Sequence, residues 1–301
     1  MTGPNSEILA WAAEVLGGDV TVVRGLREGG SPWLLQTTTK PAVLRVSPDK
    51  HSENVKTEVA AMQHAAKTGL PVPKLLGHRY ASQAGPALVL TAHVAGSSKI
   101  PVTLDIERLQ MLGAAAARIS AVEVPSMPEL PLRAGPIGDM DWVALRRKHG
   151  ASEVLQRAEN AISQLKPTSE EVVFVHGDLW HGNSLWDGST LAAILDWDAS
   201  GIGSAGIDLG SFRLDAALCY GLPAAKHVLA GWEEESGRHA TDVAYWDIVA
   251  ALATPPEMSW VLPAMADQGR PDLTAEVLSK RREDFLVQAL EQLDQTSSRL
   301  A

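Results

Sequence analysis

The sequence predicts an α+β protein of two parts, in which a strand-rich part precedes a mostly helical one. Three observations lead to this class. The chain of 301 residues is longer than one typical domain. Short runs rich in β-branched residues and bounded by Gly, Pro, Asn and Asp predominate up to residue 92. From residue 104 onward, apolar residues recur mainly at helical spacing. We therefore expect a division into residues 1–92 and 93–301.

The first part is expected to contain two helices and five strands. Asn5 or Ser6 can cap a helix that runs to Leu16 and ends at the glycine pair that follows. A second helix is expected at 52–67, where Val55 and Val59 begin a series of apolar residues at helical spacing. We expect the strands at 19–25, 33–38, 42–46, from 69–73 onward and at 87–91, with residues 26–32 as the first connecting loop.

The second part is expected to be helical on both sides of a central stretch. An Ala-rich helix at 104–122 has small residues that permit close packing against another helix, and a proline-rich crossing follows it. Cys219 lies in an apolar run and is more typical of a core residue than of a nucleophile. We expect the further helices at 139–149, 151–165, 207–220, 222–236, 241–253 and 272–292.

The central stretch from Val172 to Gly210 holds two apolar runs that end on polar side chains. The run 172–175 leads into a loop with Asp178 and Asn183, and the run 191–195 ends on Asp196. Between the two runs, Asp187-Gly188 is a strong signal for a hairpin turn. Buried strands place polar residues at their ends, so these carboxylates and the amide are expected to meet at one site.

The chemistry of these residues is that of phosphoryl transfer. Mg²⁺ prefers oxygen ligands, and Asn183 and Asp196 can supply them together with substrate phosphates. Asp178 can accept the proton of an attacking hydroxyl group. Their order and spacing match the catalytic loop of kinases followed by its metal-binding Asp. The alternative is ordinary turn chemistry, since Asp and Asn are common where strands end.

At this point the sequence resembles the aminoglycoside phosphotransferase family, which also includes choline, homoserine and fructosamine kinases. The similar segments are HGDLWHGN at 176–183, ILDWD at 194–198 and GIDL at 206–209. The resemblance implies a two-lobed protein-kinase-like fold, with a small antiparallel sheet in the N-terminal lobe and a mostly helical C-terminal lobe. It also implies Asp178 as catalytic base, Asn183 and Asp196 as Mg²⁺ ligands, and His176 and Asp208 as supports of the catalytic loop.

The pair Trp180-His181 departs from the Leu-His-Pro-Gly-Asn form usual in aminoglycoside enzymes. It is closer to the Leu-Trp-x-Gly-Asn form of fructosamine-type kinases. This departure widens the range of possible acceptors. Asp198, two residues after the expected metal ligand, can hold either a cationic acceptor or the loop itself.

ATP is the expected phosphate donor. Gly29, Gly30 and Ser31 lie between two expected strands, where glycine lets backbone N–H groups approach phosphates, although such a pair also forms ordinary hairpins. Arg45 stands where related kinases have the lysine that binds the α- and β-phosphates, and an arginine fork can also bind two phosphate oxygens. The alternative for Arg45 is an outward position on an edge strand.

Two further groups of residues complete the expected nucleotide site. Glu58 is the expected partner of Arg45, with Glu53 as the competing carboxylate. The resemblance implies that the segment 91–94 contacts adenine through its backbone, which gives Thr91, His93 and Val94 as candidate contacts.

Composition excludes several other classes of protein. No apolar run approaches the length of a membrane span, the first residues lack the features of a secretory signal, and a single cysteine allows no internal disulfide. We therefore expect a cytoplasmic protein. Nothing basic and aromatic enough indicates a nucleic-acid partner. Residues 1–94 carry a net charge of +2 and the remainder −12, which favours a cationic acceptor, although acidic surfaces also simply maintain solubility.

Three functions agree with the sequence. The first is a Mg²⁺-dependent kinase that phosphorylates a hydroxyl of an aminoglycoside or similar cationic antibiotic and so confers resistance. The second is a metabolic kinase for a sugar, amino sugar, amino alcohol or amino acid. The third is a pseudokinase that binds nucleotide without turnover, for which Arg45 is the motivation and against which the complete set of catalytic residues argues. Neither the acceptor nor the oligomeric state follows from the sequence.

Overall fold

The computed structural model describes residues 3–27, 30–38, 40–47, 52–82, 85–124, 126–138 and 140–300. Contacts within the chain define two compact units. Unit 1 comprises Met1–Ser97, Met127–Leu130 and Leu185–Asp198, and unit 2 comprises Ser98–Ser126, Pro131–Ser184 and Ala199–Ala301. The expected α+β class is confirmed, whereas the expected division between residues 92 and 93 stays a prediction.

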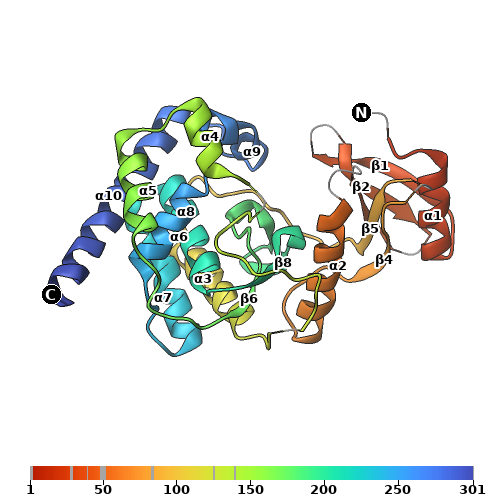
Figure 1. Cartoon of the computed structure of the whole chain (residues 1–301). Helices are drawn as coiled ribbons and strands as arrows, with labels where there is room; N and C mark the ends of the chain where they lie inside the picture. The colour runs from red at the N-terminus through yellow and green to blue at the C-terminus, as the bar shows by residue number, and fades with distance from the viewer. Residues whose placement is uncertain are drawn as a thin grey trace. The chain divides into compact units, whose positions relative to one another are not determined.

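Unit 1 is built around an antiparallel sheet of five strands in the order β1-β2-β3-β5-β4. Two helices, α1 and α2, accompany this sheet, and Figure 1 shows them in red and orange. The bounds are α1 Ser6–Leu16, β1 Val20–Arg27, β2 Gly30–Thr37, β3 Ala42–Ser47, α2 Ser52–Lys67, β4 Leu75–Arg79 and β5 Ala87–Ala92.

The two helices cover opposite faces of this sheet. Leu88 and Leu90 of β5 pack in one apolar cluster with Ile8 of α1. Val89, between them in sequence, packs in another cluster with Val59 of α2. Since successive side chains of a strand point to opposite faces, α1 and α2 lie on the two sides of the sheet.

The expected loop at 26–32 is wrong, because both strands extend into it. Arg27 of β1 pairs with Gly30 of β2. Pro32 has no N–H to contribute to a ladder, but the Ser31 hydroxyl accepts a hydrogen bond from the backbone N–H of Val46 at 3.1 Å and donates one to the Val46 carbonyl at 3.4 Å. The side chain thus joins β2 to β3 where the backbone of Pro32 cannot.

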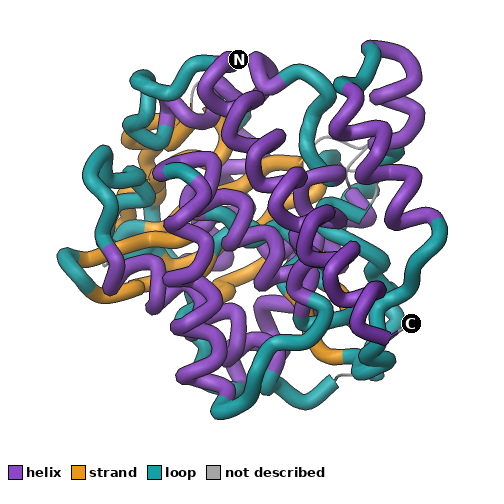
Figure 2. Tube along the Cα trace, turned by 90° about the vertical axis from the view of Figure 1, so that its left-hand side faces the viewer, coloured by secondary structure: helices purple, strands orange, loops and turns teal. Residues whose placement is uncertain are grey.

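Unit 2 is mostly helical, as expected, and Figure 2 shows the predominance of helix in the chain. Buried residues of α6, α8 and α10, among them Leu218, Ile248 and Phe285, form a shared apolar cluster. The expected core position of Cys219 is confirmed, since Cys219 is buried in this cluster. The helices are α3 Ile106–Ser120, α4 Trp142–His149, α5 Glu153–Ser163, α6 Gly206–Tyr220, α7 Ala225–Ser236, α8 Val243–Leu252, α9 Leu262–Asp267 and α10 Ala275–Leu300.

The central stretch from Val172 to Gly210 contains four short strands in the described structure. The hairpin expected at Asp187-Gly188 is confirmed, with β7 at Ser184–Asp187 and β8 at Thr190–Ile194. In unit 2, β6 at Val173–Val175 pairs antiparallel with β9 at Gly201–Gly203. Strand β9 was not predicted from the sequence, because its glycines indicate a loop. A Cβ atom on Gly201 would lie 2.3 Å from the Pro131 carbonyl oxygen, so glycine permits a close approach of two backbones there.

None of the helices in the described part of the chain is both long enough and apolar enough to cross a membrane.

Candidate active site

In unit 2, Asp208 anchors the loop that follows β6. Its two carboxylate oxygens accept hydrogen bonds from the backbone N–H groups of His176 at 2.8 Å and Gly177 at 2.9 Å. Burial raises the pKa of Asp208 to about 6, although these two hydrogen bonds act in the opposite direction. A Cβ atom on Gly177 would lie 2.3 Å from the Ala199 carbonyl oxygen, so the loop passes this backbone closely. Asp208 thus lies where a support of the loop was expected.

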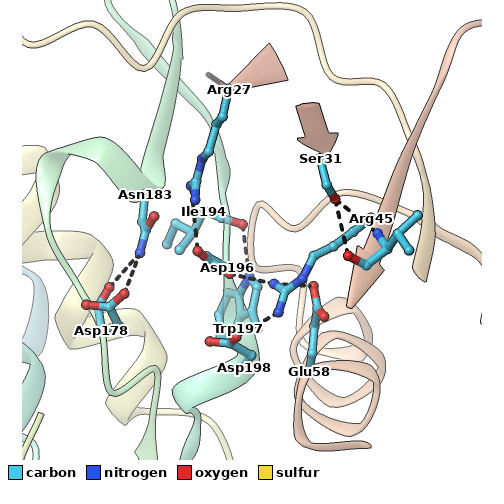
Figure 3. A network of polar contacts seen from close by, with 11 residues as sticks. Arg27, Ser31, Arg45, Glu58, Asp178, Asn183, Ile194, Asp196, Trp197 and Asp198 are labelled. Atoms are coloured by element: carbon cyan, nitrogen blue, oxygen red, sulfur yellow. Dashed lines mark hydrogen bonds and ion pairs between the residues drawn. The ribbon is translucent and has the colours of Figure 1, made fainter. Parts of the chain in front are cut away.

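Asn183 and Asp178 contact each other directly across this loop. The side-chain amide of Asn183 donates to the Asp178 carbonyl oxygen at 2.9 Å and to its carboxylate at 3.1 Å (Figure 3). Asn183 is buried, and its Oδ1 atom has no hydrogen-bond partner among the described residues. The backbone N–H of Asp178 donates to Nδ1 of His176 at 3.2 Å. The amide is therefore oriented, with its oxygen uncommitted in the described part of the chain.

Trp180 lies directly against Gly182 in this loop. A Cβ atom on Gly182 would lie 2.2 Å from the six-membered ring of Trp180. The indole therefore occupies the space of a side chain at residue 182, and glycine is required there. Trp180 itself is partly buried against the apolar cluster of α6, α8 and α10.

In unit 1, Asp196 follows the end of β8 in a backbone conformation that favours glycine, with φ of 65°. The next residue, Trp197, is buried and its ring N–H donates to the Ile194 carbonyl at 2.9 Å. The Asp196 carboxylate contacts Arg45 at 2.6 Å and Arg27 at 3.6 Å (Figure 3). Arg27 was not predictable as a partner of Asp196, since no local pattern relates a strand end to a residue so far along the chain.

Arg45 bridges three carboxylates in unit 1. Besides Asp196, its guanidinium contacts Asp198 at 2.7 Å and Glu58 at 3.3 Å. Burial lowers the pKa of Arg45, but the carboxylates of Glu58, Asp196 and Asp198 together raise it above its ordinary value. Burial raises the pKa of Glu58 to about 7, against the effect of Arg45. Glu58 is therefore the carboxylate that contacts Arg45 from α2, whereas Glu53 forms a contact with Lys56.

The remaining expected nucleotide contacts lie along β2 and β5. The hydroxyl of Ser31 is hydrogen-bonded to the backbone of Val46, Gly30 is the first residue of β2, and Gly29 lies outside the described residues. Thr91 belongs to β5 and faces Val43 and Leu75 in the sheet. The backbone N–H of His93 donates to the Pro41 carbonyl at 3.2 Å, and Val94 follows it half-buried.

The structure thus joins the expected residues in two groups. Unit 1 joins Arg45, Glu58, Asp196 and Asp198 through one guanidinium. Unit 2 joins His176, Asp178, Asn183 and Asp208 through the loop after β6. The oxygen ligands suited to Mg²⁺ are the uncommitted Oδ1 of Asn183 in unit 2 and the carboxylate of Asp196 in unit 1. In unit 1 the Asp196 carboxylate is paired with Arg45 and Arg27, so it would have to give up an arginine contact to ligate an ion.

Comparisons with known proteins show the family and the fold of the chain. The model of a family described as the phosphotransferase enzyme family matches residues 22–252. No curated protein matches the chain. A solved structure of a candidate aminoglycoside phosphotransferase from Ralstonia eutropha JMP134 has a TM-score of 0.69 and 17% sequence identity, and the match covers 95% of this chain and 98% of that one.

Two further solved structures show the same fold with different names. The AMP-bound complex of a spectinomycin phosphotransferase has a TM-score of 0.64 and 11% identity over 93% of this chain and 97% of its own. A microcompartment-associated aminopropanol kinase has a TM-score of 0.60 and 16% identity over 93% of this chain and 94% of its own. These likenesses confirm the expected kinase-like phosphotransferase fold.

Proposed function

This chain belongs to the phosphotransferase enzyme family and is a phosphotransferase, and we propose that it is a small-molecule kinase that uses ATP and Mg²⁺ to phosphorylate a hydroxyl group. The observation that carries this proposal is the contact between Asn183 and Asp178. One amide holds the side chain of the candidate base and keeps its own oxygen uncommitted in the described part of the chain. The AMP-bound relative supports an adenine nucleotide as the donor.

In the proposed mechanism, Asp178 aligns the acceptor hydroxyl and takes its proton as the acceptor oxygen bonds to the γ-phosphorus of ATP and the bond from that phosphorus to the departing ADP breaks. Asn183 and Asp196 would hold Mg²⁺, which neutralises charge on the phosphates when bound. Arg45, held by Glu58 at 3.3 Å, would bind phosphate oxygens through its planar fork. Because Arg45 also contacts Asp196 and Asp198, binding of the nucleotide must exchange some of these ion pairs for phosphate contacts.

We propose a cationic hydroxyl compound as the acceptor, with aminoglycoside-like antibiotics as the first class to test. The net charge of −12 over residues 95–301 favours a cation. The second candidate is a metabolic kinase for an amino alcohol or amino sugar, which the aminopropanol kinase and the Trp180-His181 pair favour. A screen of ATP consumption with aminoglycosides, macrolides, choline, homoserine and amino sugars separates the two.

The first prediction concerns Asp178→Asn. The amide cannot accept the proton of the acceptor, so we expect kcat to fall by about 10²–10⁴-fold. We expect the Kd of Mg-ATP to change less than about threefold, because the proposed phosphate and metal contacts remain. Steady-state phosphoryl transfer and equilibrium titration measure the two quantities. The exposed Asp187→Asn, in the turn between β7 and β8, is the control.

Two outcomes contradict the proposal. Turnover of Asp178→Asn at the wild-type rate would remove Asp178 from the mechanism. Wild-type protein that binds Mg-ATP but phosphorylates none of the tested acceptors would favour a nucleotide-binding pseudokinase.

A further inference from the structure

One buried group of unit 2 is not used by the proposed mechanism. His181 belongs to the short 3-10 turn His181–Asn183 and is fully buried. Its backbone N–H donates to Oδ2 of Asp215 at 2.8 Å, and its ring nitrogen Nδ1 contacts the same oxygen. Asp215 lies on α6 and is also buried. One carboxylate oxygen therefore binds both the main chain and the side chain of the same loop residue.

The surroundings of this pair explain why the contact is stable. Cys219, one helical turn after Asp215, places its Sγ 3.8 Å from Oδ1 of that carboxylate. Burial, together with the carboxylate of Asp215, raises the pKa of the Cys219 thiol well above its ordinary value. The sulfur is thus a protonated donor. The three side chains lie close enough to suggest a metal site, but a thiol in this state and an oxygen that already accepts two hydrogen bonds favour a chain of hydrogen bonds instead.

The pair acts on the part of the loop that carries Asn183. The Ser184 hydroxyl donates to the His181 carbonyl at 2.6 Å, and the Asn183 N–H donates to the Trp180 carbonyl at 3.0 Å. Gly182 has no side chain with which to hold the turn, and the Trp180 ring fills the space beside it. The buried side chain of His181 thus ties the turn to α6, two residues before the amide that holds Asp178.

We propose that His181 and Asp215 are positioning residues, which fix the turn 181–183 on α6 and thereby orient the Asn183 amide toward Asp178. This inference rests on the proposed function for its catalytic consequence, but not for the structural one. It gives a role to the histidine of the Trp180-His181 pair. Neither residue touches the reacting atoms, so their effect is on kcat through the geometry of Asn183 and Asp178.

The test compares His181→Leu with His181→Asn. Leucine fills the cavity but donates no hydrogen bond. The Asn side-chain nitrogen is bonded to Cγ, as Nδ1 of histidine is, and can therefore reach the same Asp215 oxygen. The matched control is Asp247→Asn on α8. Asp247 forms a buried ion pair with Arg213, which lies on α6 as Asp215 does, and its two contacts are both 2.8 Å.

Amide hydrogen exchange of peptides covering 176–187 is the first measurement. We expect exchange in this loop to be roughly 10- to 100-fold faster in His181→Leu, since a hydrogen bond to a charged group is lost. In His181→Asn we expect exchange within about threefold of wild type. Asp247→Asn should lower the thermal midpoint without a change confined to the loop.

Phosphoryl transfer is the second measurement. In His181→Leu, kcat should fall at least about tenfold while the KM of the acceptor stays within about threefold, and His181→Asn should recover most of kcat. The inference is overturned if the loop of His181→Leu exchanges at the wild-type rate, or if Asn and Leu have equal effects on it.

Two outcomes need a further measurement: a variant that does not fold, and a wild-type protein without activity on the tested acceptors. If His181→Leu does not fold, Asp215→Leu replaces it, since leucine is close to aspartate in shape but accepts neither N–H group of His181; unchanged loop exchange in that variant would overturn the inference. If the wild-type protein phosphorylates none of the acceptors, the proposed function fails, whereas hydrogen exchange still decides whether the pair positions the loop.

Discussion

At the scale of one residue, Asp208 supports the loop after β6, and burial of its carboxyl group lowers the stability of the folded protein. Its carboxylate accepts two backbone hydrogen bonds, yet burial raises its pKa to about 6. An unfolded aspartate has a pKa of about 3.9. Between these values the folded state retains a proton that the unfolded state has lost. The contribution of Asp208 to stability therefore decreases as pH rises from about 4 to about 6, and the full cost is present above pH 6.

This sign gives a prediction for Asp208→Asn. The variant does not titrate at this position and loses one backbone hydrogen bond, so it should be less stable than wild type. The difference in unfolding free energy between the two proteins should shrink as pH rises from 4 to 7. Since one pKa unit corresponds to roughly 1.4 kcal/mol, we expect a change of roughly 2–3 kcal/mol. Denaturant titrations at several pH values measure it, and a difference independent of pH would contradict the raised pKa.

The residues of the candidate site were predictable where the signal is local. The series from His176 to Asn183 and the end of the apolar run at Asp196 name the chemistry by residue type and spacing. The contacts of Arg45 with Asp196 and Asp198 were not predictable, because they join residues about 150 positions apart. One sequence alone does not show which distant carboxylates contact the same guanidinium.

At the scale of elements, α3 and α7 cross at unusually short distance. A Cβ atom on Gly113 of α3 would lie 1.9 Å from the Val228 carbonyl oxygen, and one on Gly231 of α7 would lie 2.0 Å from the Gln110 carbonyl oxygen. Each helix thus uses a glycine where it meets the backbone of the other. The close packing expected from the small residues of 104–122 is confirmed.

This crossing predicts an unusual response to alanine. Alanine is favoured over glycine inside a helix by about 1 kcal/mol. In Gly113→Ala, however, the methyl group must displace the backbone of α7, and we expect a net loss of about 1–3 kcal/mol. The control Ala114→Gly on the same helix should also destabilise, by about 1 kcal/mol, because it changes only propensity. If Gly113→Ala stabilises the protein in thermal or denaturant unfolding, the close crossing is wrong.

Helices were predicted well where residues next to their ends cap them. The Asn5 side chain accepts the Ile8 N–H at 2.9 Å and Gly17 ends α1 in the left-handed region, so caps mark both ends of this helix. Asp242 lies at the N-terminal end of α8, but its side chain does not cap this helix. Its carboxylate accepts the backbone N–H groups of Thr168 and Ser169 instead of those of α8.

At the scale of the whole molecule, charge is the property that bears on the acceptor. The chain has a net charge of −10, and its first 94 residues are nevertheless slightly positive. Family membership and fold do not reveal the acceptor, because structures of the same fold bear the names of a spectinomycin phosphotransferase and an aminopropanol kinase. The distribution of charge does provide a test, since electrostatic attraction depends on ionic strength whereas the shape of a site does not.

If the acceptor is a cation drawn to the acidic part of the chain, its KM should rise with salt. The Debye length shortens from about 14 Å at 0.05 M to about 4 Å at 0.5 M ionic strength, which screens attraction between solvent-exposed charges. For an acceptor with several positive charges we expect KM to increase about tenfold or more over this range, while an uncharged sugar changes less than about twofold. Measurements at saturating Mg-ATP separate this effect from the binding of nucleotide. A cationic acceptor whose KM is independent of salt would show that the acidic part contributes solubility alone, and would favour recognition of the acceptor by contacts other than long-range charge.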